Sequence, residues 1–135
     1  MSFTKLNPDG LPAPRGWNHG MLGPVGGRVL FVAGMTAAGA DGTVPAGLDF
    51  LAQWDRALAS IVAVLRAAGA QPEHVGRMTV FVADIEVYRT SLTGLSEVWN
   101  RHMGRHYPAM ALVQAGGFVD PNAMVEIETT AVLPA

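Results

Sequence analysis

The sequence predicts a single α+β domain, in which a mixed β-sheet carries two helices packed on one of its faces. The chain has 135 residues, enough for one ordinary domain and too few for two, so we expect one domain over residues 1–135. Strand-like runs alternate with two helix-like segments, and each strand–helix–strand unit makes a crossover that is normally right-handed. The sequence offers no third helix for the opposite face of the sheet, so we expect another subunit to cover it.

Composition and charge exclude several classes of protein. Half of the residues are apolar and 15% are charged, which argues against disorder, because disordered chains combine low hydrophobicity with high charge. The absence of cysteine excludes disulfides, thiolate catalysis and cysteine-based metal sites. The formal net charge of -2 provides no basic surface, so we expect no nucleic-acid partner. No segment resembles a signal peptide or a membrane helix, so we expect a cytoplasmic protein without membrane contact.

The first third of the chain is expected to hold short strands and loops. Proline and glycine are frequent up to Gly20, which indicates extended or looped backbone, with a short edge strand at 3–6. Residues 21–22 and the β-branched run 28–33 flank a Gly-Pro turn, a pattern that predicts a hairpin. The glycine-rich stretch 34–47 is expected to be a loop.

The clearest helix is predicted at 49–68. Asp49 is a suitable N-cap, and Gly69 is a suitable residue to end the helix. Apolar residues recur there at intervals of four and three, which is the spacing of one helical face. They are Phe50, Trp54, Leu58, Ile61 and Leu65.

The second half of the chain repeats the pattern of strand, helix and strand. Residues 75–85 contain a nearly continuous apolar run, which is typical of a strand buried on both faces, and a second helix is predicted at 86–103. A strand at 109–114 follows, and then a turn at 116–122. The final strand, 125–132, alternates: one face holds Val125, Ile127, Thr129 and Ala131, and the other holds Glu126 and Glu128.

Two segments near the C-terminus carry a recognisable pattern. Residues 107–116 read YPAMALVQAG, and residues 124–128 read MVEIE. Together they resemble the signature of the RidA/YjgF family, which is Pro-Ala-Arg-small, a strand, a loop and then Val/Ile-Glu-Ile-Glu. Residues 54–69 resemble the first helix of that family and 77–85 its central strand, so the resemblance extends over nearly the whole chain.

The resemblance implies a chorismate-mutase-like fold assembled as a homotrimer. The sheets would form the inside of the trimer, and small-molecule pockets would lie in the clefts between subunits. Many members of the family hydrolyse reactive enamines or imines to a keto acid and ammonia. The resemblance implies that this chemistry needs no metal and no organic cofactor.

The chain departs from the signature at Met110, where the family's deaminating members have an arginine. That guanidinium holds the carboxylate of the substrate through two parallel hydrogen bonds. Charge-assisted hydrogen bonds contribute about 1.5–3 kcal/mol each, so their loss should weaken carboxylate binding by several powers of ten. Another arginine could supply the charge, and the candidates are Arg15, Arg28, Arg101 and Arg105.

The remaining site residues follow from the same resemblance. Glu126 matches the glutamate that positions a water or acts as general base, although a carboxylate exposed on a strand is the plainer interpretation. Glu128 points to the same side and is either a pocket residue or part of an ion pair between subunits. Trp17 matches an aromatic residue at the pocket rim, with His19 beside it, although a Trp packed on its loop and a solvated His explain this pair equally well.

Three further predictions concern the floor of the pocket and a metal. Met35 and Met110 would make the pocket apolar and adaptable, and Leu112 would offer its backbone N–H to a ligand oxygen. Of the other histidines, His102 and His106 have the spacing of a shared metal face. His106 is expected to lie beyond the helix end, so we expect no metal site.

Two functions from different classes follow. The first is a hydrolase of the RidA type that acts on an enamine, an imine or a related carbonyl compound lacking the α-carboxylate, and is not a canonical 2-imino acid deaminase. The second is a non-catalytic trimer that binds a metabolite or regulates a partner. A third activity, endoribonuclease, is attached to some relatives, but the charge of -2 and the sparse Lys and Arg argue against it.

Overall fold

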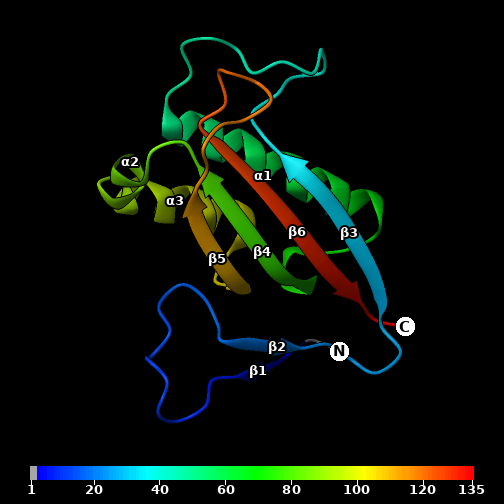
Figure 1. Cartoon of the computed structure of the whole chain (residues 1–135). Helices are drawn as coiled ribbons and strands as arrows, with labels where there is room; N and C mark the ends of the chain where they lie inside the picture. The colour runs from blue at the N-terminus through cyan, green and yellow to red at the C-terminus, as the bar shows by residue number, and fades with distance from the viewer. Residues whose placement is uncertain (1–2) are drawn as a thin grey trace.

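The protein consists of a four-stranded mixed sheet with its two long helices on one face and a short two-stranded ribbon beyond one end of the sheet (Figure 1). The computed structural model describes residues 3–135. In spatial order the sheet contains β3 (Arg28–Met35), β6 (Val125–Leu133), β4 (Val75–Val82) and β5 (Ala109–Gln114). This arrangement confirms the predicted α+β class.

The strand directions confirm two crossover units. β4 and β5 are parallel neighbours, and β6 runs antiparallel to both β3 and β4. β3 and β4 therefore point the same way, with β6 between them. Helix α1 (Phe50–Ala67) connects β3 to β4, and helix α3 (Leu92–Met103) lies on the path from β4 to β5. A 3-10 turn, η1 (Pro72–His74), precedes β4.

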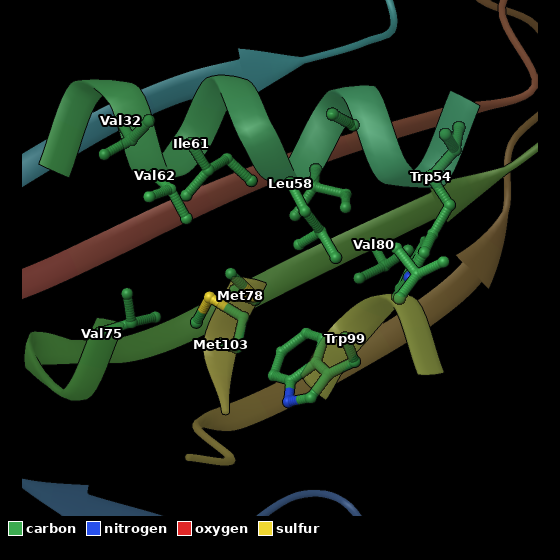
Figure 2. Close-up of a cluster of buried hydrophobic side chains, with 14 of the residues drawn as sticks. Val32, Trp54, Leu58, Ile61, Val62, Val75, Met78, Val80, Trp99 and Met103 are labelled. Carbon is green, nitrogen blue, oxygen red and sulfur yellow. The ribbon is translucent and has the colours of Figure 1, made fainter. Parts of the chain in front are cut away.

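Helix α1 begins and ends where its sequence signals predict. The Asp49 carboxylate accepts a hydrogen bond from the backbone N–H of Ala52 at 2.8 Å, as an N-cap should. Gly69, just past the helix, has a φ of 74°, a conformation that favours glycine. Leu58 and Ile61 extend from α1 toward the sheet, where Met78 of β4 meets them (Figure 2).

The helix predicted at 86–103 is interrupted, and this part of the prediction is wrong. Two helices occupy the segment, α2 (Ile85–Arg89) and α3. At the break, the Thr90 hydroxyl donates to the Glu86 carbonyl at 3.0 Å, and the Ser91 hydroxyl donates to the Val87 carbonyl at 2.6 Å. Ser and Thr side chains that bond to nearby backbone carbonyls compete with helical hydrogen bonding, which explains the interruption.

The predicted hairpin between residues 21–22 and 28–33 is also wrong. β2 (Gly20–Leu22) pairs with β1 (Thr4–Leu6), whereas β3 pairs with β6. The expected turn between β2 and β3 does form, and in it the N–H of Gly27 donates to the Pro24 carbonyl at 3.2 Å. Pairing of β3 with β6 buries Val32 in the main core, and the three residues of β2 have no buried side chain to offer.

The two faces of the sheet differ in what covers them. The face under α1 and α3 carries the main hydrophobic core, and Ile127 and Ala131 of β6 are fully buried there. The other face, here called the open face, exposes 80% of Phe31, with Val29 and Val113 about half exposed. Within residues 3–135, no helix is long and apolar enough to span a membrane.

Candidate functional site

The sheet separates the residues that the sequence grouped into one pocket. In the β4–β5 ladder, Met110 pairs with Met78 and Leu112 pairs with Val80. Paired residues share a face, and Met78 and Val80 are fully buried under the helices. Met110 and Leu112 therefore lie on the helical face. Glu126, which pairs with Phe81, lies on the open face.

A cavity of about 200 Å³ lies on the helical face, between α1, α3 and the edge strand β5. Its aromatic lining comes from Trp54, Tyr88, Trp99 and Tyr107. Its aliphatic lining comes from Leu92, Leu95, Met110 and Leu112, and the remaining lining residues are Gly16, Ser96 and Asn100. No lining residue carries a charge at neutral pH, so this region, here called the aromatic cavity, provides no partner for an ionised ligand.

The walls of the aromatic cavity form a continuous aromatic row. The rings of Trp54 and Trp99 have centroids 6.4 Å apart, and those of Trp99 and Tyr107 lie 6.1 Å apart with an angle of 8° between their planes. Burial raises the pKa of the Tyr88 hydroxyl. The indole N–H of Trp99 donates to the His106 carbonyl at 3.1 Å. The indole N–H of Trp54 is buried and has no hydrogen-bond partner among the described residues.

Glu126 occupies space that a glycine leaves free. A Cβ atom added to Gly34 of β3 would lie 2.5 Å from Oε2 of Glu126, far closer than real contacts allow. The register of β3 on β6 shifts between Val32 and Met35, and Gly34 lies within this irregularity. The carboxylate therefore lies across β3, on the open face, and the residue is partly buried.

Within one copy of the chain, Met35 lies neither in the aromatic cavity nor beside Glu126 on the open face. It pairs with the buried Ile127, and it packs against the main core on the helical face. It is not among the lining residues of the aromatic cavity. The expected apolar floor built from Met35 and Met110 together is therefore not formed within one copy.

Trp17 and His19 belong to a loop that is tied to the start of β5. Their rings make an edge contact with centroids 4.6 Å apart, and the His19 ring donates from Nε2 to the Pro12 carbonyl at 2.7 Å. Asn18 between them donates from its side chain to the Tyr107 carbonyl at 2.6 Å and from its backbone to the Pro108 carbonyl at 3.1 Å. Of this loop, Gly16 lines the cavity. Sequence reasoning missed Asn18, because no local pattern links it to a segment some 90 residues later.

Glu128 lies apart from the aromatic cavity, in a shallow depression of the open face. Its neighbours there include Arg77, Thr79 and Phe31. The position agrees with a residue that meets a second subunit, one of the two interpretations left open above.

The four candidate arginines do not line the aromatic cavity. Arg101 has its guanidinium 3.8 Å from Asp55, which also accepts the His102 ring at 2.5 Å. Arg28 begins β3, opposite Leu133, and Arg105 follows the end of α3. Arg15 is exposed beside Gly16.

The two histidines with metal spacing are held by different partners. His106 lies beyond the end of α3, as expected, and its Nε2 donates to the Val75 carbonyl at 2.7 Å. Burial lowers the pKa of His106, and the Val75 carbonyl partly opposes that shift. Across residues 3–135, no group of three or more His, Asp or Glu side chains is placed to hold a metal ion.

A family model and solved structures of the Rid and YjgF proteins match this chain. A family model described as "Endoribonuclease L-PSP" matches residues 11–133. The crystal structure of a conserved Rid family protein, YyfB from Yersinia pestis, is 30% identical, covers 98% of this chain and 100% of its own, and superposes with a TM-score of 0.85. The YjgF gene product from E. coli is 25% identical, with 96% and 98% coverage and a TM-score of 0.66. Protein DfrA from Myxococcus xanthus is 33% identical over 62% of this chain, and the match spans 60% of the length of DfrA.

Proposed function

Because the chain belongs to the RidA/YjgF family and has the chorismate-mutase-like fold of that family, we propose that it hydrolyses uncharged enamines or imines. The family model that matches the chain is the one described as endoribonuclease L-PSP. The sites would lie between copies of the chain in a homotrimer. The substrates would lack the α-carboxylate that canonical 2-imino acids carry. Neither a metal nor an organic cofactor takes part in this reaction.

One observation carries the substrate class: Met110, at the position of the family's arginine, lines a cavity to which its own copy contributes no charged side chain. A carboxylate that enters an apolar cavity loses its hydration and gains no cation in return. Charge-assisted hydrogen bonds would contribute about 1.5–3 kcal/mol each, and methionine supplies none. An uncharged C=N compound avoids this cost, so the cavity favours it.

The faces of the sheet support a site that is shared between copies. Glu126 and Met110 lie on opposite faces in one copy, so one reaction centre containing both requires the Met110 edge of one copy beside the Glu126 face of another. The exposed apolar side chains of Val29, Phe31 and Val113 on the open face favour such an association.

The proposed chemistry assigns a role to each group. Glu126 accepts a proton from a water molecule while the water oxygen adds to the C=N carbon, and the protonated Glu126 then passes this proton to the nitrogen, which becomes an amine. In the resulting carbinolamine, Glu126 takes the hydroxyl proton and transfers it to the nitrogen, so that the C–N bond breaks, ammonia leaves and the carbon becomes a carbonyl. One water is consumed and one ammonia is released, so atoms and protons balance. Gly34 leaves the space in which the Glu126 carboxylate lies.

The test compares charged and uncharged imines. Ammonia release is measured from 2-iminopropionate formed in situ and from the N–H imine of a simple ketone, each against its rate in buffer. We expect acceleration of the uncharged imine, its loss in Glu126→Ala, and no acceleration of 2-iminopropionate. A large acceleration of 2-iminopropionate that Glu126→Ala removes would overturn the proposed substrate class and show that another group supplies the cation.

The same Met110 also favours a second candidate, a trimer that binds a metabolite or regulates a partner without catalysis. The two functions differ in what Glu126→Ala does. Under hydrolysis the variant loses turnover and keeps ligand binding, whereas a binding module shows no turnover in either form. Endoribonuclease activity is disfavoured by the net charge of -2, because phosphate backbones are bound by clustered Lys and Arg.

A further inference from the structure

We propose that Asn18 is a positioning residue of the aromatic cavity, because its side chain ties the Tyr107 wall of the cavity to the loop that carries Gly16. Asn18 itself does not line the cavity, so it acts through these two residues. The consequence for substrate rests on the proposed function, whereas the consequence for the cavity wall can be tested without turnover.

The loop that carries Gly16 depends on side-chain bonds for its conformation. Residues 7–19 connect β1 to β2 and contain neither a helix nor a strand. Pro8, Pro12 and Pro14 have no backbone N–H to donate. A segment without a regular backbone ladder is stable only where other groups bond it to the rest of the fold, and Asn18 supplies that connection.

Asn18 joins this loop to the segment just before β5. Its side-chain amide donates to the Tyr107 carbonyl at 2.6 Å, and its backbone N–H donates to the Pro108 carbonyl at 3.1 Å. Asn18 is 9% exposed, so water has little access to replace these bonds. One residue therefore holds two successive carbonyls of the segment that leads to Met110.

The other end of the Asn18 amide is also engaged. Its Oδ1 accepts from Nδ2 of Asn7 at 2.8 Å, and Oδ1 of Asn7 accepts the backbone N–H of His19 at 2.8 Å. An amide that bonds through both its oxygen and its nitrogen has one orientation that satisfies both partners. The chain of bonds therefore runs from Asn7 through Asn18 to Tyr107, and it fixes the loop and the wall relative to each other.

The residues that Asn18 holds shape the cavity. Gly16 and Tyr107 both line it, and the Tyr107 ring stacks on Trp99 with 6.1 Å between the centroids. The Trp99 indole N–H donates to the carbonyl of His106, the residue before Tyr107. Displacement of the segment 106–107 would therefore move two aromatic walls of the cavity at once.

The experiment compares Asn18→Leu with a matched control, Asn122→Leu. Leucine keeps the approximate volume of asparagine and removes its side-chain hydrogen bonds. Asn122 donates from its side chain to the Val44 carbonyl at 3.2 Å, so the control loses a similar bond between residues that do not line the aromatic cavity. Steady-state hydrolysis of the N–H imine of cyclohexanone gives KM and kcat for each form.

The two variants should differ in KM. Asn18→Leu should raise KM roughly tenfold and keep kcat within about twofold of the wild type, because substrate binding must then also order the wall. Asn122→Leu should change neither constant. A purely structural role of Asn18 would instead reduce the folded fraction, which lowers the apparent kcat at constant KM.

A second readout needs no turnover, because it follows the solvent exchange of indole N–H groups of the full chain by NMR. In Asn18→Leu the Trp99 N–H should exchange at least about tenfold faster, since its acceptor belongs to the released segment. The N–H of Trp54, which is buried on α1, is the reference for global unfolding. If Asn18→Leu does not fold, Asn7→Ala at an exposed position removes the bond to Oδ1 of Asn18, and it should raise KM and the exchange rate about threefold.

Several results would overturn the inference. They are an unchanged KM in Asn18→Leu, a lower kcat at constant KM, equal acceleration of exchange at Trp54 and Trp99, or the same changes in Asn122→Leu. A wild type without turnover refutes the hydrolase proposal, and the exchange readout then decides the inference alone. Turnover by the wild type with unchanged Trp99 exchange in Asn18→Leu leaves the hydrolase proposal standing and refutes the inference.

Discussion

The carboxylate of Glu126 lies in the space that the side chain of residue 34 would occupy if residue 34 were not glycine. An added Cβ at Gly34 would lie 2.5 Å from Oε2 and 3.0 Å from Cδ of Glu126. The two residues come from neighbouring strands, β3 and β6, and the local irregularity in their pairing brings them together. The direction of the Glu126 carboxylate therefore depends on a residue without a side chain, and this dependence can be tested.

Gly34→Ala should impair the proposed hydrolysis with little effect on folding. The new methyl group displaces the far end of a flexible side chain, so the free energy of unfolding should change by less than about 1 kcal/mol, while turnover of an uncharged imine falls at least about tenfold. Gly117→Ala is the matched control, because no atom lies within 4 Å of its added Cβ. Equal turnover in the two variants would show that the position of the Glu126 carboxylate is unimportant.

Met110→Arg should convert the cavity to carboxylate binding. A guanidinium at this position restores the bidentate partner of the family's deaminating members, so 2-iminopropionate should be hydrolysed by the variant and not by the wild type. Ammonia release is the measurement, and Met110→Gln, which is polar but uncharged, is the control. Activity in Met110→Gln equal to that in Met110→Arg would contradict a role for the charge.

Gln53→Leu should destabilise the fold through lost hydrogen bonds. Gln53 is 1% exposed, donates to the carbonyls of Leu48 and Asn122, and accepts the N–H of Met124. Removing these partners inside the protein should lower the free energy of unfolding by roughly 3 kcal/mol. Urea denaturation measures the change. Arg56→Leu, on an exposed position of the same helix, should stay within about 0.5 kcal/mol of the wild type.

His106 should make stability fall as the solution becomes acidic. Burial lowers the pKa of His106 in the folded protein below its usual 6.5, so between those two values the unfolded chain binds more protons. Its contribution is complete above the unfolded pKa and is lost as the pH falls through the folded pKa. Thermal unfolding from about pH 7.5 to 5 should therefore show a smaller loss in His106→Asn than in the wild type. If stability falls equally with pH in the variant and in the wild type, this assignment is refuted. The other histidines are present in both proteins, so their effect cancels in the comparison.

Phe31→Glu should dissociate the proposed homotrimer. Phe31 is 80% exposed on the open face, and a charge there cannot be buried against another copy without a large desolvation cost. Sedimentation velocity at micromolar concentration should show a trimer for the wild type and a monomer for the variant. Val119→Glu is the control, because Val119 is fully exposed in the loop that precedes β6. A monomeric wild type would remove the shared site altogether.

The sequence by itself determined the elements whose signals are local. The 49–68 prediction for α1 differs from the observed bounds by one residue at each end, because periodic apolar residues and the Asp49 cap act within a few turns. The strand at 109–114 matches β5, and the alternation from Val125 to Ala131 correctly placed Glu126 on the opposite face from these residues, which the structure buries. The resemblance in residues 107–116 and 124–128 was likewise legible without coordinates, and the family comparison confirms it.

The tertiary structure decided which distant residues meet. The partner of β2, the space at Gly34 for Glu126, and the buried N–H of Trp54 all depend on strand register and on side chains separated by many residues. Met110 and Glu126 looked like one site in the sequence, yet strand alternation places them on opposite faces of a single copy. Periodicity and capping act between near neighbours, whereas register and cavity shape come from packing over the whole chain, and no local pattern encodes them.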